Sequence, residues 1–192
     1  MEPKQYEEEV SNNSSNGAEY DVPTEGGWIQ WFCMLEGNSF FCEIDEDYIR
    51  DAFNLYGIKR KLETTRLQEC LELILSPTNP LENELQEEEY LEINQEASEV
   101  YGVIHSRFIL TPRGLALMYQ KFMSGHFGVC PRVQCDKQPT LPIGMTDEPR
   151  TSRVKMYCAV CKEVYVPKDS VMNIDGAYFG SSFPHVFLQV IL

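Results

Sequence analysis

The sequence predicts an α+β protein in which an α-helical N-terminal domain precedes a small antiparallel β domain. Two observations predict this order. Apolar side chains recur at helical spacing from about residue 45 to residue 125, and two pairs of closely spaced cysteines follow, among short alternating segments typical of strands. We therefore expect three regions: 1–26, 27–125 and 126–192.

The first 26 residues are polar and acidic and include a Ser-Asn cluster at 11–17. They cannot bury enough apolar surface to offset the entropy of ordering, so a disordered acidic tail is expected. No apolar stretch precedes Asp21, unlike in a signal peptide, and no apolar run approaches membrane-spanning length. We therefore expect no membrane association and a reducing location, in the cytoplasm and nucleus.

Four amphipathic helices are predicted in the region 27–125. The first follows Asp45, a candidate N-cap, and ends before Gly57, while the fourth begins at Thr111-Pro112 and ends at Gly125. Such stripes are more typical of a helical core than of a cofactor site. The stripes are, in order, Tyr48, Ile49, Ala52, Phe53 and Tyr56; Leu67, Leu71, Ile74 and Leu75, ended by Pro77; Tyr90, Ala97, Val100, Tyr101, Ile104 and Phe108; and Leu115, Met118, Tyr119 and Phe122.

Charge is unevenly distributed along the chain. Residues 1–99 carry 24 acidic and 6 basic side chains, a net of −18, whereas residues 100–192 carry 6 acidic and 10 basic ones, a net of +4. An acidic half repels nucleic acid and anionic lipid and attracts basic proteins or polyamines. Five glutamates form one dense acidic cluster: Glu82, Glu84, Glu87, Glu88 and Glu89. A solvated surface is the ordinary explanation of such a cluster, and an acidic loop that binds polycations is the alternative.

Two cysteine pairs, Cys130 with Cys135 and Cys158 with Cys161, are separated by 22 residues. Each short-spaced pair folds into a knuckle that directs two thiolates to one point, and two knuckles complete a tetrahedral cage for one structural Zn²⁺. All four positions are thiols, which leaves no ligand position for a reactive water. Disulfides or unrelated free thiols are the alternatives, and a reducing location disfavours disulfides. Three isolated cysteines in apolar surroundings are expected in the core: Cys33, Cys42 and Cys70.

The second pair lies between two predicted strands, 154–157 and 163–166, so the fold is an α-helical N-terminal domain followed by a small antiparallel β zinc ribbon. A ribbon of about 50 residues is too small to bury a full core, so zinc and a second copy of the chain would supply stability. A chelator is expected to unfold the ribbon while the helices persist on a separate core. The candidates for the dimer interface are Val133, Val164, Tyr165 and Pro167, which alternatively cover the helical domain of the same chain.

No catalytic constellation is present in the sequence. It contains no Gly-rich phosphate loop, kinase catalytic loop or hydrolase elbow, and its three histidines are far apart. An enzyme is therefore the weaker interpretation. A nucleic-acid-binding zinc ribbon of the transcription-factor kind is the other alternative, but residues 126–192 hold 7 basic and 6 acidic groups and lack a dense basic surface.

Seven sequence blocks together resemble the regulatory (beta) subunit family of the protein kinase casein kinase II, from Trp28 to about Leu188. The resemblance implies an α-helical domain and a zinc ribbon through which two copies dimerise, scaffold two catalytic subunits and modulate their substrate selection. It also implies that the acidic loop binds polyamines. Family members continue past the position of Leu192 into a segment that grips the catalytic subunit, and Gln134 departs from the usual pattern. The blocks are 28–33 (WIQWFC), 37–49 (GNSFFCEIDEDYI), 101–111 (YGVIHSRFILT), 127–135 (FGVCPRVQC), 141–144 (LPIG), 154–158 (VKMYC) and 175–184 (DGAYFGSSFP).

Overall fold

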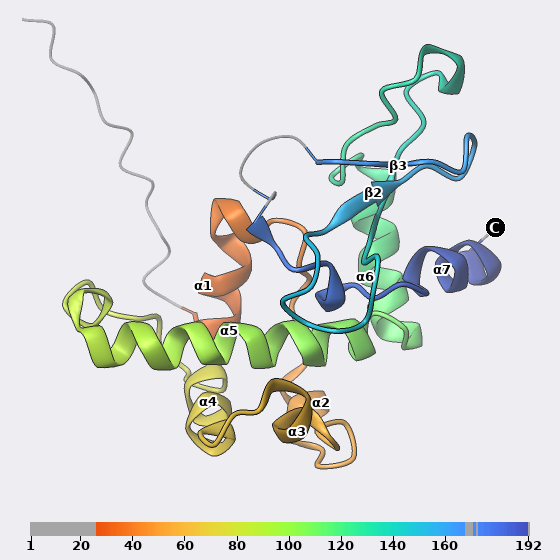
Figure 1. The fold of residues 1–192 in the computed structure, drawn as a ribbon. Coiled ribbons are helices and arrows are strands. Elements are labelled where there is room, and N and C mark those ends of the chain that lie inside the picture. Colours follow the sequence, from red (N-terminus) through yellow and green to blue (C-terminus); the bar gives the residue numbers. More distant parts are fainter. Residues whose placement is uncertain (1–25, 168–170, 172, 192) are drawn as a thin grey trace, which may run out of the picture.

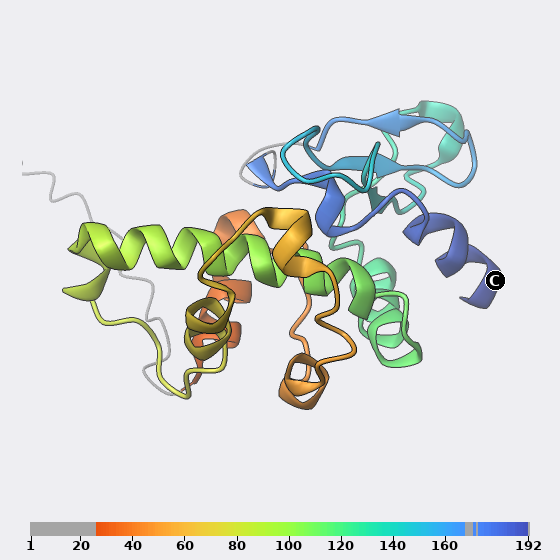
Figure 2. The same cartoon turned by 60° about the horizontal axis from the view of Figure 1, so that its bottom comes forward.

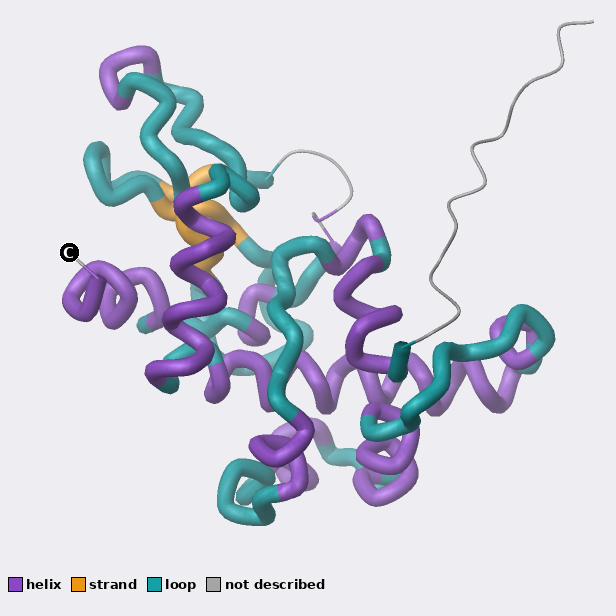
Figure 3. Tube along the Cα trace, turned by 180° about the vertical axis from the view of Figure 1, so that it is seen from behind, coloured by secondary structure: helices purple, strands orange, loops and turns teal. Residues whose placement is uncertain are grey.

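The computed structural model describes residues 26–167, 171 and 173–191, so nearly all of the predicted acidic tail lies outside it. The described residues form an α+β fold, as predicted, in which helices dominate and the strands are short (Figure 3). The helices are α1 (Trp28–Met34), α2 (Glu46–Arg50), α3 (Ile58–Leu62), α4 (Leu67–Ile74), α5 (Glu88–Phe108), α6 (Pro112–Met123) and α7 (Phe183–Ile191). The strands are β1 (Leu141–Ile143), β2 (Lys155–Tyr157) and β3 (Val164–Tyr165), and short 3₁₀ turns include η2 (Glu84–Gln86), η3 (Val133–Cys135) and η5 (Gly176–Tyr178).

Helix α5 crosses the whole molecule, with α2, α3 and α4 on one side and β2 and β3 on the other (Figure 1). One stripe of α5 is buried, as its helical periodicity predicts, including Ala97, Tyr101 and Ile104. Gly102 allows η5 to pack closely on α5, because a Cβ at this position would lie 2.4 Å from the ring of Tyr178. The ribbon consequently lies over the C-terminal half of α5 (Figure 2).

Three of the four predicted helical stripes are confirmed, as α4, α5 and α6. The side chain of Thr111 caps α6 by accepting a hydrogen bond of 3.1 Å from the backbone N–H of Gly114. The predicted helix over 48–56 is wrong, because α2 ends at Arg50 and turns follow it. Asp51 accepts a 2.9 Å hydrogen bond from the backbone N–H of Phe53, a local side-chain contact that favours a turn over a helix.

The sheet is antiparallel in the order β1-β2-β3, with Leu141 opposite Tyr157 and Met156 opposite Tyr165. The two predicted strands around the second cysteine pair are confirmed as β2 and β3. Strand β1 has no sequence signature, because all three of its residues are buried and its middle residue is Pro142. Helix α7 contacts β1, so the C-terminal segment covers the sheet.

One continuous hydrophobic core contains residues from both sides of the predicted domain boundary at residue 125. The expectation of a separate helical core is therefore wrong. The rings of Phe40 and Phe127 lie 5.3 Å apart, nearly perpendicular. Met156 of the sheet and Phe183 of α7 belong to the same buried cluster as Trp28 of α1. The strands are too short to enclose a core of their own, so their apolar side chains pack on the helices instead.

Candidate metal centre

The fold brings the four paired cysteines to one point. Cys130 and Cys135 flank a loop that ends in η3, and Cys158 and Cys161 lie in the turn between β2 and β3. Their four sulfur atoms lie within 4.8 Å of one another, and the sulfurs of Cys130 and Cys161 are 3.8 Å apart. Four sulfurs at tetrahedral positions with metal–sulfur bonds of about 2.3 Å are themselves about 3.8 Å apart. The cluster therefore has the dimensions of a closed metal site.

Backbone bonds fix the knuckles that carry these thiols. The N–H of Cys130 donates to the carbonyl of Gln138 at 2.8 Å, and the N–H of Cys158 donates to the carbonyl of Glu163 at 3.0 Å. Each knuckle is thus closed by a backbone hydrogen bond of its own. Because the second knuckle is also the turn of the β2–β3 hairpin, strand pairing positions its two sulfurs.

The thiols of the cluster differ in their protonation. Removal from water raises the pKa of Cys135 to about 12 and also raises the pKa of Cys158. A hydrogen bond from the hydroxyl of Tyr165 lowers the pKa of Cys161 to about 6. Cys135 and Cys158 therefore hold their protons near neutral pH, and a divalent metal ion would displace those protons on binding.

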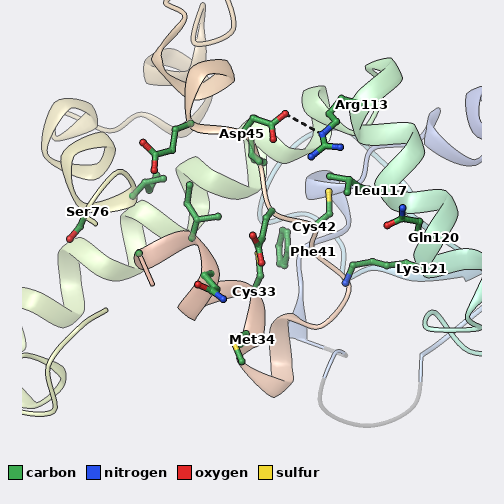
Figure 4. Close-up of a pocket in the computed structure, with 17 residues that line it drawn as sticks. Cys33, Met34, Phe41, Cys42, Asp45, Ser76, Arg113, Leu117, Gln120 and Lys121 are labelled. Atoms are coloured by element: carbon green, nitrogen blue, oxygen red, sulfur yellow. Dashed lines mark ion pairs between the residues drawn. The ribbon is translucent and has the colours of Figure 1, made fainter. Parts of the chain in front are cut away.

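A cavity of about 650 Å³ lies between α1, α6 and the segment 41–46. Figure 4 shows Arg113, Leu117, Gln120 and Lys121 of α6 along one wall of this cavity, and the Nε of Arg113 pairs with the carboxylate of Asp45 at 3.5 Å. Two of the isolated cysteines, Cys33 and Cys42, contribute to its lining, whereas Cys70 is buried elsewhere in the core.

The only close Cys–His contact found in the described residues is inert. The Nε2 of His105 lies 3.4 Å from the sulfur of Cys42, but it already accepts the backbone N–H of Cys42 at 3.2 Å. Burial raises the pKa of Cys42 to about 12 and lowers that of His105 to about 4, so both are neutral near pH 7. A nucleophilic cysteine requires the opposite shifts. His126 and His185 have other neighbours: Ser39, whose carbonyl oxygen lies 2.7 Å from the Nε2 of His126, and the ring of Tyr157.

The predicted interface residues lie in different environments. Val133 is 95% exposed and Val164 is also exposed, whereas Tyr165 is half-buried and Pro167 is buried. Along β3 the side chains alternate, so Val164 and Val166 face solvent while Tyr165 contacts the cysteine cluster. The sequence analysis missed three further exposed valines of the ribbon: Val129, Val160 and Val166.

The acidic loop lies at the N-terminal end of α5, away from the ribbon (Figures 1 and 2). Glu84 is half-buried and accepts a 2.7 Å hydrogen bond from the backbone N–H of Leu81, while the other four glutamates are exposed. In the described part of the chain, no ion pair joins any of these five glutamates to a lysine or arginine. Their mutual repulsion is therefore relieved only by solvent and ions.

Helices joined to a small ribbon in which four cysteine sulfurs converge on one point define a protein of the metal-ribbon type. The chain belongs to the casein kinase II regulatory subunit family, whose model matches residues 27–191. This confirms the family resemblance and the non-catalytic, regulatory role that it implies. The alternative of a nucleic-acid-binding ribbon is not favoured.

Relatives in three kingdoms share most of the chain. It is 48% identical to casein kinase II subunit beta of Schizosaccharomyces pombe over 164 residues, which are 85% of this chain and 69% of the relative. It is 45% identical to subunit beta' of Drosophila melanogaster over 86% of this chain and 74% of the relative. It is also 45% identical to putative subunit beta-4 of Arabidopsis thaliana over 91% of this chain, which spans only 60% of that relative. Across the described residues, no helix is both long and apolar enough to cross a membrane.

Proposed function

We propose that this chain is a zinc-stabilised, dimeric regulatory subunit that scaffolds casein kinase II catalytic subunits and modulates their substrate selection. Family membership supports the association with a kinase catalytic subunit. The single observation that carries the structural part is the cluster of four cysteine sulfurs, because a metal bound there would hold the ribbon in a fixed shape for contact with a second copy.

Zinc is the metal that suits this cage. Four thiolates at tetrahedral spacing favour Zn²⁺ among common divalent ions, and a site with four protein ligands has no open position for chemistry. We propose one Zn²⁺ per chain, held by Cys130, Cys135, Cys158 and Cys161 in a structural role. Thiolate ligands persist in reducing surroundings, which supports a location in the cytoplasm and nucleus.

Dimerisation through the ribbon is supported by its exposed apolar side chains. Val133 and Val164 belong to the proposed interface, together with Tyr165 and Pro167, and Val129, Val160 and Val166 of the ribbon are exposed as well. Exposed apolar side chains of this number on a small β module favour contact with a second copy. For the acidic loop we propose binding of basic proteins or polyamines, on the basis of its five glutamates without basic partners.

Co-expression with a casein kinase II catalytic subunit tests the function. The tagged chain is expected to retain the catalytic subunit through purification, to behave as a dimer in light scattering, and to change the relative phosphorylation rates of an acidic and a basic protein substrate. A chain with Cys158→Ser and Cys161→Ser, which lacks half of the metal cage, is the matched control. A parent chain that neither retains the catalytic subunit nor alters these rates would refute the proposal.

A further inference from the structure

Cys161 is the vulnerable ligand of the cysteine cage. Its side chain is half-buried, whereas the other three cysteines of the cluster are buried. A thiolate near solvent is where protons, oxidants and chelators reach a metal site first. The residues around Cys161 therefore decide how long the site retains its metal.

The hydroxyl of Tyr165 lies 3.3 Å from the sulfur of Cys161 and also interacts with Cys130. Tyr165 is fixed for this contact by the sheet, because β3 pairs it with Met156 in the buried middle of β2. Its ring packs against the cysteine cluster and the main core. The sheet thus holds this hydroxyl against the sulfur of Cys161.

We propose that Tyr165 is a positioning residue of the metal centre, which donates a hydrogen bond to the Cys161 thiolate and slows the loss of the metal. The inference rests on the proposed zinc site. Partners that hydrogen-bond a metal ligand change metal affinity by about 10-fold to 100-fold when removed. The hydroxyl of Tyr165 would therefore serve the metal centre, in addition to the place of the ring in the proposed dimer interface.

Tyr165→Phe in the full chain tests the proposal, because it removes the hydroxyl and keeps the ring. Zinc content is first measured by elemental analysis in the parent and the variants. Each protein is then mixed with excess chromogenic chelator and the zinc-transfer rate is recorded. We expect Tyr165→Phe to release zinc about 10-fold faster than the parent. Tyr157→Phe, in the adjacent strand, is the matched control and should release zinc at the parental rate.

Two further readouts separate a positioning role from a structural one. In the zinc-loaded protein, alkylation by iodoacetamide should increase at Cys161 in Tyr165→Phe, while the buried Cys135 stays protected. Light scattering should show the same oligomeric state for Tyr165→Phe and the parent. Equal zinc-transfer rates for the parent, Tyr165→Phe and Tyr157→Phe would overturn the inference and leave the proposed function intact. A parent chain without zinc would refute both.

Discussion

His105 makes the stability of the helical core depend on pH. The ring is fully buried; its Nε2 accepts the backbone N–H of Cys42 and its Nδ1 donates to the carbonyl of Tyr178 at 2.8 Å. Both ring nitrogens are therefore used by the neutral tautomer. Burial, reinforced by the positive charge of Lys121, lowers the pKa of His105 from 6.5 to about 4.

The sign of the effect follows from this depressed pKa. Between pH 6.5 and pH 4 the unfolded chain binds a proton at His105 that the folded chain does not, so acidification favours unfolding. The loss of stability that this proton binding causes is nearly constant above pH 7 and grows as the pH falls from 6.5 to 4. With these two pKa values, His105 decreases the free energy of unfolding by about 2 kcal/mol between pH 7 and pH 5.

A variant isolates this contribution from the other titrating groups. Urea unfolding of the parent and of His105→Gln is followed at pH 7 and pH 5 by fluorescence of Trp28 and Trp31, which are buried in the core. His105→Gln should be less stable at pH 7, but its free energy of unfolding should fall by about 2 kcal/mol less on acidification. Carboxylates and the metal-binding thiols titrate equally in both proteins and cancel in the difference. An identical pH dependence of the two proteins would refute the assignment of a buried neutral histidine.

Three other predictions address the metal, the interface and the acidic loop. Removal of zinc by a chelator should lower the melting temperature of the chain in a single transition, because the strands share the core with the helices; calorimetry showing two separate transitions would contradict the shared core. Val164→Asp should shift the chain from dimer to monomer in light scattering, because it places a charge in the proposed apolar contact. Glu163→Asp, the control, should leave the dimer intact. A dimeric Val164→Asp chain would mean that the contact lies elsewhere. Spermine should bind the parent more tightly than a chain with the five glutamates of the acidic loop changed to glutamine. The difference in affinity should shrink with added salt, because exposed charges are screened over about 8 Å at physiological ionic strength. Equal affinities of the two proteins in calorimetric titrations would mean that the loop is only a solvated surface.

Local signals in the sequence predicted much of this fold. The thiol spacing indicated the cage because each knuckle involves only a few neighbouring residues, and the stripes of α4, α5 and α6 carry the helical period of a buried face. The helix predicted over 48–56 failed beyond Arg50 because the apolar residues of its second half do not face the core: Phe53 is 84% and Tyr56 is 81% exposed, whereas Ile49 is buried. Periodicity alone cannot distinguish such a run from a buried one.

Features that depend on distant contacts were not accessible from the sequence. The contact between Cys42 and His105 joins residues 63 positions apart, and the shared core depends on ring contacts such as that of Phe40 with Phe127. The inward direction of Tyr165 depends on the register of β3 with β2, which a two-residue strand does not specify by itself. Tertiary packing, rather than local propensity, fixes each of these.

Helix α5 acts as a spacer between two ends of the subunit. Its 21 residues extend about 32 Å, with the acidic loop at one end and the ribbon over the other half. In a dimer joined at the ribbon, each subunit would carry its acidic loop at the end of α5 that is remote from the ribbon. A small polycation would then engage one loop at a time, whereas a long basic chain that spans both would gain affinity from bivalent attachment, without any additional contact within either subunit.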